Sequence, residues 1–238
     1  LARQAESTVM SPDEENWGIG NTNANDFWLT YNVRGEGILV ANIDSGVRYT
    51  HEALYSKYAC AGQIYHHNCW FDPDDPYYYD EDPIDANGHG THTMGTIVGS
   101  TYVNKIGMAP NAKWIACQGC DGTACDPVDL MACADWILAP GDNPENRPNV
   151  VNNSWSGLDI DPWFIPYVLA WRAAGIFPAF SAGNYGPNCG TLGEPGAYQE
   201  SFASAAHDLN ELEYSKGSRG PSYWGDEPYT KPNLSAPG

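Results

Sequence analysis

The stretch GILVANID, residues 37–44, decides the fold that this sequence predicts. Its apolar residues follow one another without a polar alternation, which is typical of a strand buried on both faces of a sheet. Further strand-like runs lie at residues 112–117, 150–154, 176–182 and 201–206. Helical patterns lie at residues 89–99, 128–138 and 163–174. Strands separated by helices predict an α/β fold with a mostly parallel central sheet and helices on both faces.

Composition narrows the classes of partner. The 238 residues hold 11 Lys and Arg against 30 Asp and Glu, a net charge of −19. Such a field repels phosphate backbones and anionic bilayers, so we expect neither nucleic acid nor a membrane as a partner. No apolar run reaches the roughly 18 residues that a membrane-spanning helix needs. We expect residues 1–16 to form an extended arm and residues 17–238 to form one domain, without internal repeats.

Two segments carry the candidate chemistry. Asp44 ends the first strand, and His89 lies in the run NGHGTHT, residues 87–93, at the predicted start of a helix. Reactive groups gather at the carboxyl ends of parallel strands, and a buried carboxylate needs a permanent hydrogen-bond partner. An imidazole Nδ1–H can be that partner, and the carboxylate then fixes the ring tautomer. The alternative interpretation is that Asp44 only ends a strand and His89 only begins a helix.

Taken together, the run DSG at residues 44–46 and the run NGHGTHT resemble the Asp and His motifs of subtilisin-like serine proteases. The run FSAGNYG, residues 180–186, resembles the family segment whose asparagine amide supplies part of the oxyanion hole. The run VVNNSWSG, residues 150–157, resembles the strand that pairs with the substrate backbone. The run TLGEPG, residues 191–196, matches the floor of the pocket for the side chain before the cut.

The resemblance therefore implies a set of site residues and a three-layer subtilisin-like fold. The implied catalytic residues are Asp44, His89 and Asn184. The implied substrate-binding residues are Ser154, Trp155, Ser156, Gly157, Ala182, Gly183 and Gly193. A second edge for substrate pairing would lie near residues 119–126. A glycine floor at Gly193 leads us to expect room for a large apolar or aromatic side chain.

The resemblance also implies an activity. The runs HGTHTMGTIVG, AKWIAC, VVNNSW and AWRAAGIFPAF are similar to the bacillopeptidase F-like subgroup of subtilases. In the family pattern the nucleophilic serine would follow residue 238, and Ser235 cannot replace it because it precedes that segment. We therefore expect a secreted serine endopeptidase, nicked or truncated, that acts on proteins or peptides. Its serine would lie outside this chain, for example on a C-terminal fragment of the same precursor. The alternative is a non-catalytic peptide-binding or scaffold protein.

Seven cysteines suggest an oxidising, extracellular location. Cys60 and Cys69 could form one bridge. Cys117, Cys120, Cys125 and Cys133 allow three connectivities, of which we favour Cys120–Cys125 with Cys117–Cys133. A four-cysteine zinc site is the competing interpretation, and Cys189 is left over, either free or paired outside this chain.

Residues 72–85 carry seven acids, which could hold a structural calcium ion or form a solvated loop. The family chemistry requires no cofactor, and the identity of any bound metal stays open.

Overall fold

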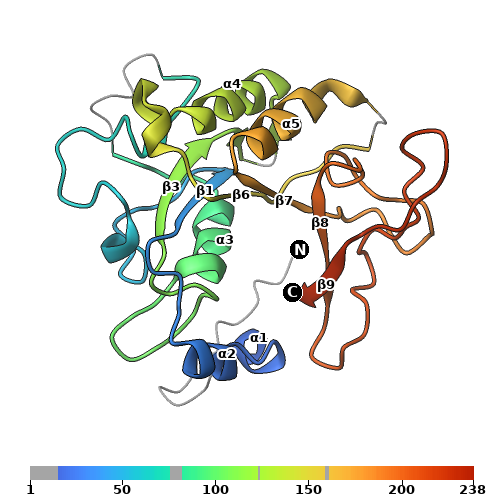
Figure 1. Ribbon diagram of the computed structural model, residues 1–238, viewed down its shortest axis with the longest axis horizontal. Helices are drawn as coiled ribbons and strands as arrows, with labels where there is room; N and C mark the ends of the chain where they lie inside the picture. Colours follow the sequence, from blue (N-terminus) through green and yellow to red (C-terminus); the bar gives the residue numbers. More distant parts are fainter. Residues whose placement is uncertain (1–15, 76–81, 123, 159–160) are drawn as a thin grey trace, which may run out of the picture.

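A single parallel sheet forms the centre of the computed structural model, which describes residues 16–75, 82–122, 124–158 and 161–238 (Figure 1). Its seven strands follow the order β2-β3-β1-β6-β7-β8-β9, and all neighbouring pairs run parallel. The strands are β1 (Leu39–Asp44), β2 (Trp70–Phe71), β3 (Lys113–Gln118), β6 (Val150–Asn153), β7 (Phe177–Ser181), β8 (Phe202–His207) and β9 (Leu234–Pro237).

Helices cover both faces of this sheet. The α-helices of the described residues are α1 (Trp17–Asn21), α2 (Ala24–Tyr31), α3 (His89–Val98), α4 (Pro127–Leu138) and α5 (Ile165–Ala173). Figure 1 shows α3 on one face and the neighbouring helices α4 and α5 on the other. The predicted three-layer α/β fold is therefore confirmed. In the described parts of the chain, no helix is long and apolar enough to cross a membrane.

The core lies between the sheet and its helices. Ala41 and Ile43 of β1 and Trp114 of β3 are fully buried. Met94 of α3 and Trp171 of α5 are buried in the same apolar cluster. Burial of one large apolar side chain contributes about 1.5–3 kcal/mol. The strand that ends at Asp44 and the strand directly before Ser154 both contribute residues to this core.

Several short elements were absent from the sequence prediction. All five predicted strands and all three predicted helices are present, with ends that differ by a few residues. The additional ones are α1, α2, the edge strands β2 and β9, and a hairpin of β4 (Cys120–Asp121) and β5 (Ala124–Cys125). These elements are too short to show a clear periodicity. Of the predicted N-terminal arm only Asn16 is described, and it caps α1 by accepting a hydrogen bond from Gly18 N at 3.0 Å.

The topology predicts where a site should lie. From β1 the chain moves to β3 on one side, then crosses over to β6 on the other side. The strand order therefore reverses at β1, and in open parallel sheets ligands bind outside the carboxyl ends of the strands at such a point. Asp44 is the last residue of β1, and Ser154 directly follows β6.

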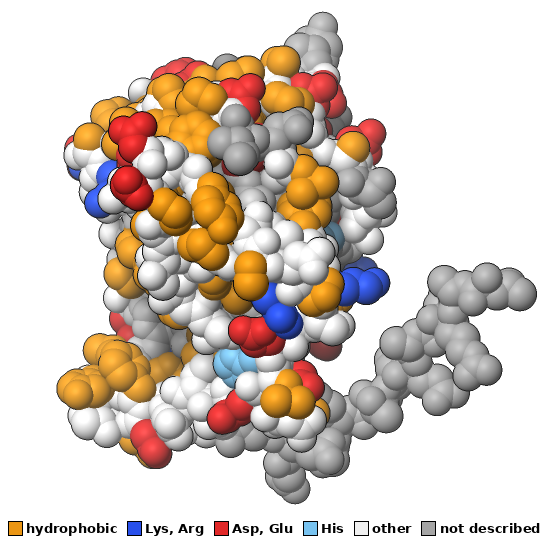
Figure 2. Space-filling view, turned by 90° about the vertical axis from the view of Figure 1, so that its right-hand side faces the viewer, with side chains coloured by type: hydrophobic (Ala, Val, Ile, Leu, Met, Phe, Trp, Pro, Cys, Tyr) orange, Lys and Arg blue, Asp and Glu red, His pale blue; other side chains and the backbone are white. Residues whose placement is uncertain are grey.

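The surface reflects the acidic composition. Figure 2 shows acidic side chains spread over one face, together with patches of hydrophobic side chains and few basic groups. Three ion pairs are present among the described residues: Asp44–His89, His66–Asp82 and Glu213–Arg219. Most acidic side chains in the described parts therefore lack a cationic partner.

Candidate active site

Asp44 is held at the end of β1 by hydrogen bonds to both carboxylate oxygens. The residue is buried, with 3% of its surface exposed. Its Oδ1 accepts a hydrogen bond from Ser45 N at 2.7 Å and lies 2.7 Å from His89 Nδ1. Its Oδ2 accepts a longer one from Thr93 Oγ1 at 3.4 Å. These donors stabilise the ionised carboxylate, which would be costly to bury alone.

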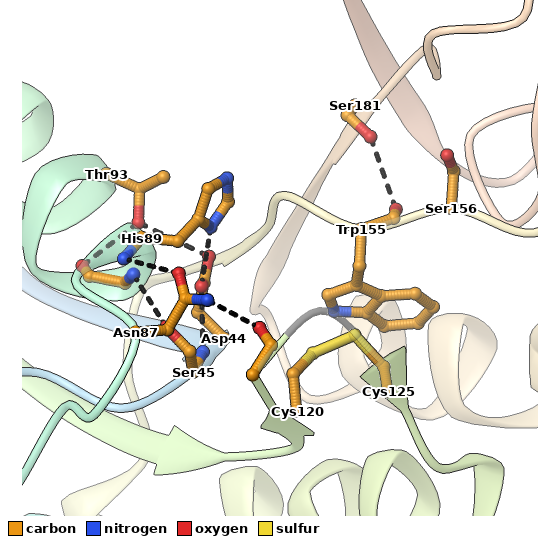
Figure 3. The surroundings of a disulfide bond; sticks show 12 residues. Asp44, Ser45, Asn87, His89, Thr93, Cys120, Cys125, Trp155, Ser156 and Ser181 are labelled. Carbon is orange, nitrogen blue, oxygen red and sulfur yellow. Dashed lines mark hydrogen bonds and ion pairs between the residues drawn. A yellow bond between two sulfur atoms is a disulfide. The ribbon is translucent and has the colours of Figure 1, made fainter. Parts of the chain in front are cut away.

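His89 is the first residue of α3, and its side chain is about half exposed, at 51%. Figure 3 shows its ring directed from the helix end toward Asp44. Because the ionised Asp44 can only accept, Nδ1 carries the proton toward it, and Nε2 is left as the basic nitrogen. The following Gly90 lies so close to Gly46 O that a Cβ there would overlap that carbonyl. A glycine at this position therefore lets α3 approach β1.

Asp85 fixes the start of α3 and was not recognised from the sequence as a site residue. Its Oδ1 accepts hydrogen bonds from Gly88 N at 2.7 Å and from Ser45 Oγ at 3.0 Å. Its Oδ2 accepts from Thr91 N at 2.8 Å. Partial burial raises the pKa of Asp85, but its hydrogen bonds from Thr91, Gly88 and Ser45 outweigh that effect and lower it overall. Asp85 therefore stays ionised and ties the helix of His89 to the residue after Asp44.

A buried polar network links the acid–histidine pair to β6. Asn42 Nδ2 donates to Thr93 Oγ1 at 3.0 Å, and Thr93 in turn contacts Asp44. Asn152 Nδ2 donates to Asn42 Oδ1 at 2.8 Å and to Ser154 Oγ at 3.0 Å. The β1–β6 register places Asn42 and Asn152 opposite each other, a pairing that the sequence did not predict.

The segment of residues 154–157, here called the wall segment, follows β6. Gly157 N and O both pair with the backbone of Glu194, at 2.9 and 3.0 Å. The Trp155 indole packs edge-to-face on Phe164 and Phe180 instead of facing solvent, and Figure 3 shows it beside the Cys120–Cys125 disulfide. Of the four predicted wall residues, Trp155 is therefore buried, whereas Ser154, Ser156 and Gly157 are partly exposed.

The segment of residues 182–186, here called the asparagine loop, follows β7. Ala182 is buried and donates its N–H to Ser204 O at 2.9 Å, which continues the strand. Gly183 O accepts a hydrogen bond from Ser218 N at 3.0 Å. The Asn184 side chain is exposed, and within the described residues its amide has no hydrogen-bond partner. Its amide is thus free to donate to a ligand.

Gly193, which the resemblance assigns to the pocket floor, contacts both the wall segment and the asparagine loop. Its N–H donates to Ala182 O at 3.0 Å. A Cβ on Gly193 would lie 2.8 Å from Ser156 Cβ and 2.9 Å from Tyr185 Cε2. Ser156 and the Tyr185 ring therefore lie directly against Gly193, contacts that the sequence did not predict.

The three favoured disulfides are confirmed: Cys60–Cys69, Cys117–Cys133 and Cys120–Cys125. This excludes the four-cysteine zinc site. Cys189 is exposed and unpaired within this chain. No cluster of three or more metal-ligating side chains occurs in the described ranges, and residues 76–81 of the acidic segment proposed for calcium lie outside them.

Ser235, rejected as a nucleophile from its sequence position, lies elsewhere in the fold. Its Oγ is 3.0 Å from His207 Nδ1. Within the described residues, no hydroxyl group forms a hydrogen bond with the His89 ring. The described residues therefore bring together an acid and a base, Asp44 and His89, without a hydroxyl hydrogen-bonded to the base.

Sequence comparison agrees with this geometry. The model of the subtilase family matches residues 35–238. The chain belongs to the subtilase family.

Similar named proteins include three from Bacillus subtilis (strain 168). The chain is 38% identical to bacillopeptidase F over 263 aligned residues, which cover 99% of this chain and 17% of that protein. It is 27% identical to serine protease AprX, covering 87% of this chain and 47% of AprX. It is 32% identical to minor extracellular protease Vpr, covering 81% of this chain and 23% of Vpr. The chain thus spans less than half the length of these relatives.

Proposed function

We propose that this chain supplies the acid, the base and the oxyanion donor of a secreted serine endopeptidase. The nucleophilic serine would be contributed by polypeptide outside these 238 residues. The single observation that carries the proposal is the 2.7 Å contact between buried Asp44 and His89 Nδ1 at the carboxyl end of β1. Membership in the subtilase family and the similarity to bacillopeptidase F and to serine protease AprX support it.

The residues have distinct roles in the proposed reaction. Asp44 orients the His89 ring and stabilises the imidazolium that forms when Nε2 takes the proton of the serine hydroxyl. His89 then donates this proton to the leaving amine. Asn184 donates to the oxygen that becomes negative, a contribution of about 2.7–4 kcal/mol in comparable sites. An extended substrate would add itself beside the wall segment, as peptides do at free strand edges.

Secretion is part of the proposal and rests on two observations. Three disulfides are formed, and such bonds persist in oxidising surroundings. The relative Vpr is named as an extracellular protease.

The experiment uses the full-length protein. It is treated with a serine-directed fluorophosphonate, and every polypeptide in the preparation is weighed by mass spectrometry. We expect the label on one serine outside this chain. His89→Ala should lower the labelling rate by orders of magnitude, because removing the histidine of such a triad costs on the order of 10⁶-fold in kcat.

His92→Ala is the matched control, since His92 is exposed and lies one turn further along α3. This variant should be labelled like the wild type. Equal labelling of His89→Ala and wild type would contradict the catalytic role. Absence of label on any folded species would favour the alternative, a non-catalytic protein that binds peptides without cutting them.

A further inference from the structure

Tyr185 connects the asparagine loop to the wall segment. Its hydroxyl donates a hydrogen bond to Ser156 O at 2.7 Å and lies 3.3 Å from Ser156 Oγ. Ser156 O is a backbone acceptor on the segment proposed to pair with substrate. Tyr185 directly follows Asn184, and its side chain thus reaches from the asparagine loop across to the wall segment.

The ring of Tyr185 fills the space that lies between these two segments. A Cβ on Gly193 would lie 2.9 Å from Tyr185 Cε2, and a Cβ on Gly183 would lie 3.0 Å from Tyr185 Cδ2 and Cε2. Both glycines therefore lie in direct contact with the ring. The absence of a side chain at Gly183 and Gly193 makes room for Tyr185 and leaves no empty floor.

The backbone of Tyr185 is also held in place. Its N–H donates to Ser218 Oγ at 3.0 Å, and Ser218 is 2% exposed. The next N–H, of Gly186, donates to Lys216 O at 2.9 Å. The position of the ring is therefore set at both ends, by the anchored backbone and by the bound hydroxyl.

We propose that Tyr185 closes the pocket for the side chain before the cut and makes the enzyme select small residues there, such as Gly, Ala or Ser. This inference rests on the proposed function, because it concerns the substrate class of the same site. A large side chain can enter only if the ring leaves and both hydrogen bonds to Ser156 break. Small residues fit beside the ring without moving it.

Kinetics on the full-length protein test the proposal. Two internally quenched peptides are compared that differ only in having Ala or Phe before the cut. Wild type should cleave the Ala peptide with a kcat/KM at least about tenfold higher, since a few methylene groups change discrimination by about 10–200-fold. Tyr185→Ala should raise the Phe-to-Ala ratio of kcat/KM by at least about tenfold.

Two further variants show which property of Tyr185 matters. Tyr185→Phe keeps the ring and loses the hydroxyl, so its Phe-to-Ala ratio should stay within about threefold of wild type. A ratio as high as that of Tyr185→Ala would overturn the claim that the ring fills the pocket. Tyr223→Ala removes an exposed tyrosine from a neighbouring loop and should leave the ratio unchanged. A wild type that cleaves both peptides equally well would also overturn the proposal.

A binding experiment separates this proposal from the proposed function. If neither labelling nor cleavage occurs, the full-length protein is titrated with product-like peptides that end in Ala or Phe, and the Kd is measured by calorimetry. Two results together would support the closed pocket without catalysis. Wild type should bind the Ala peptide with a lower Kd than the Phe peptide, and Tyr185→Ala should bind the Phe peptide at least about tenfold more tightly than wild type does. Equal affinities in both proteins, or no binding of either peptide, would overturn it.

Discussion

Lys231 is a buried cation at the edge of the sheet formed by β8 and β9. Its residue surface is 5% exposed, and Nζ donates hydrogen bonds to Ser201 O and, at 2.9 Å, to Asn233 Oδ1. Burial lowers the pKa of Lys231 from 10.5 to about 8. In the folded chain Lys231 therefore loses its proton around pH 8. In the unfolded chain it does so around pH 10.5.

This difference predicts a pH dependence of stability. Between about pH 8 and 10.5 the unfolded chain binds more protons at Lys231 than the folded chain does, so the free energy of unfolding should rise with pH. The rise is limited to about 1.4 kcal/mol per pH unit for one group. The free energy of unfolding of wild type and of Lys231→Met is measured with urea from pH 7 to 10.5. The difference, wild type minus variant, should rise with pH. The exposed Lys216→Met is the control, and a difference that falls with pH would contradict the assignment.

Some residues of the candidate site could be predicted from the sequence, and others could not. Asp44 and His89 were predictable because each lies at the end of a strongly patterned element within a recognisable motif. Asp85 and Tyr185 were not, because their importance depends on partners that the folded chain brings to them. Asp85 appeared only as one acid among many, and no periodicity indicated that the Tyr185 ring would lie against Gly193.

At the scale of elements, the Cys117–Cys133 disulfide joins β3 to α4. Both cysteines are fully buried, and 16 residues separate them. Closing a loop of about this size stabilises a fold by roughly 3 kcal/mol in the chain-entropy model. This bridge therefore stabilises the packing of α4 on the strand beside β1.

Removing this bridge should destabilise the whole chain. We expect Cys117→Ala combined with Cys133→Ala to lower the free energy of unfolding by about 3 kcal/mol, measured by urea denaturation under non-reducing conditions. Cys189→Ala is the matched control and should have no comparable effect, because that cysteine is exposed and unpaired within this chain. A double variant as stable as wild type would show that the bridge is not formed in solution.

Elements were predictable in proportion to their length and burial. The strands at residues 39–44 and 113–118 carry apolar runs, because both of their faces are covered by helices. The edge strands β2 and β9 have two and four residues, and each has a neighbour on only one side. Their sequences therefore carry too little of the apolar pattern that marks a strand.

At the scale of the whole molecule, the net charge of −19 should oppose folding through self-repulsion. Salt screens such repulsion, with a Debye length of about 10 Å at 0.1 M. We expect the free energy of unfolding at pH 7 to rise when NaCl increases from about 0.02 M to about 0.3 M. Urea is the appropriate denaturant, because guanidinium chloride is itself a salt.

The control for this effect is the same titration near pH 4.3, the isoelectric point of the sequence. With little net charge to screen, the stabilisation by salt should disappear there. A loss of stability with salt at pH 7 would show that local ion pairs outweigh the overall repulsion.

The pairing of β1 with β6 also determines when the site can be completed. Asp44 and His89 are 45 residues apart, whereas Asn42 and its partner Asn152 are 110 residues apart. The wall segment begins 65 residues after His89, so at about 5–20 residues per second the ribosome reaches it roughly 3–13 s after His89. During translation Asp44 and His89 can therefore be present together before the wall segment exists, so a nascent chain can hold the acid–histidine pair while the side of the site beyond β6 is still missing.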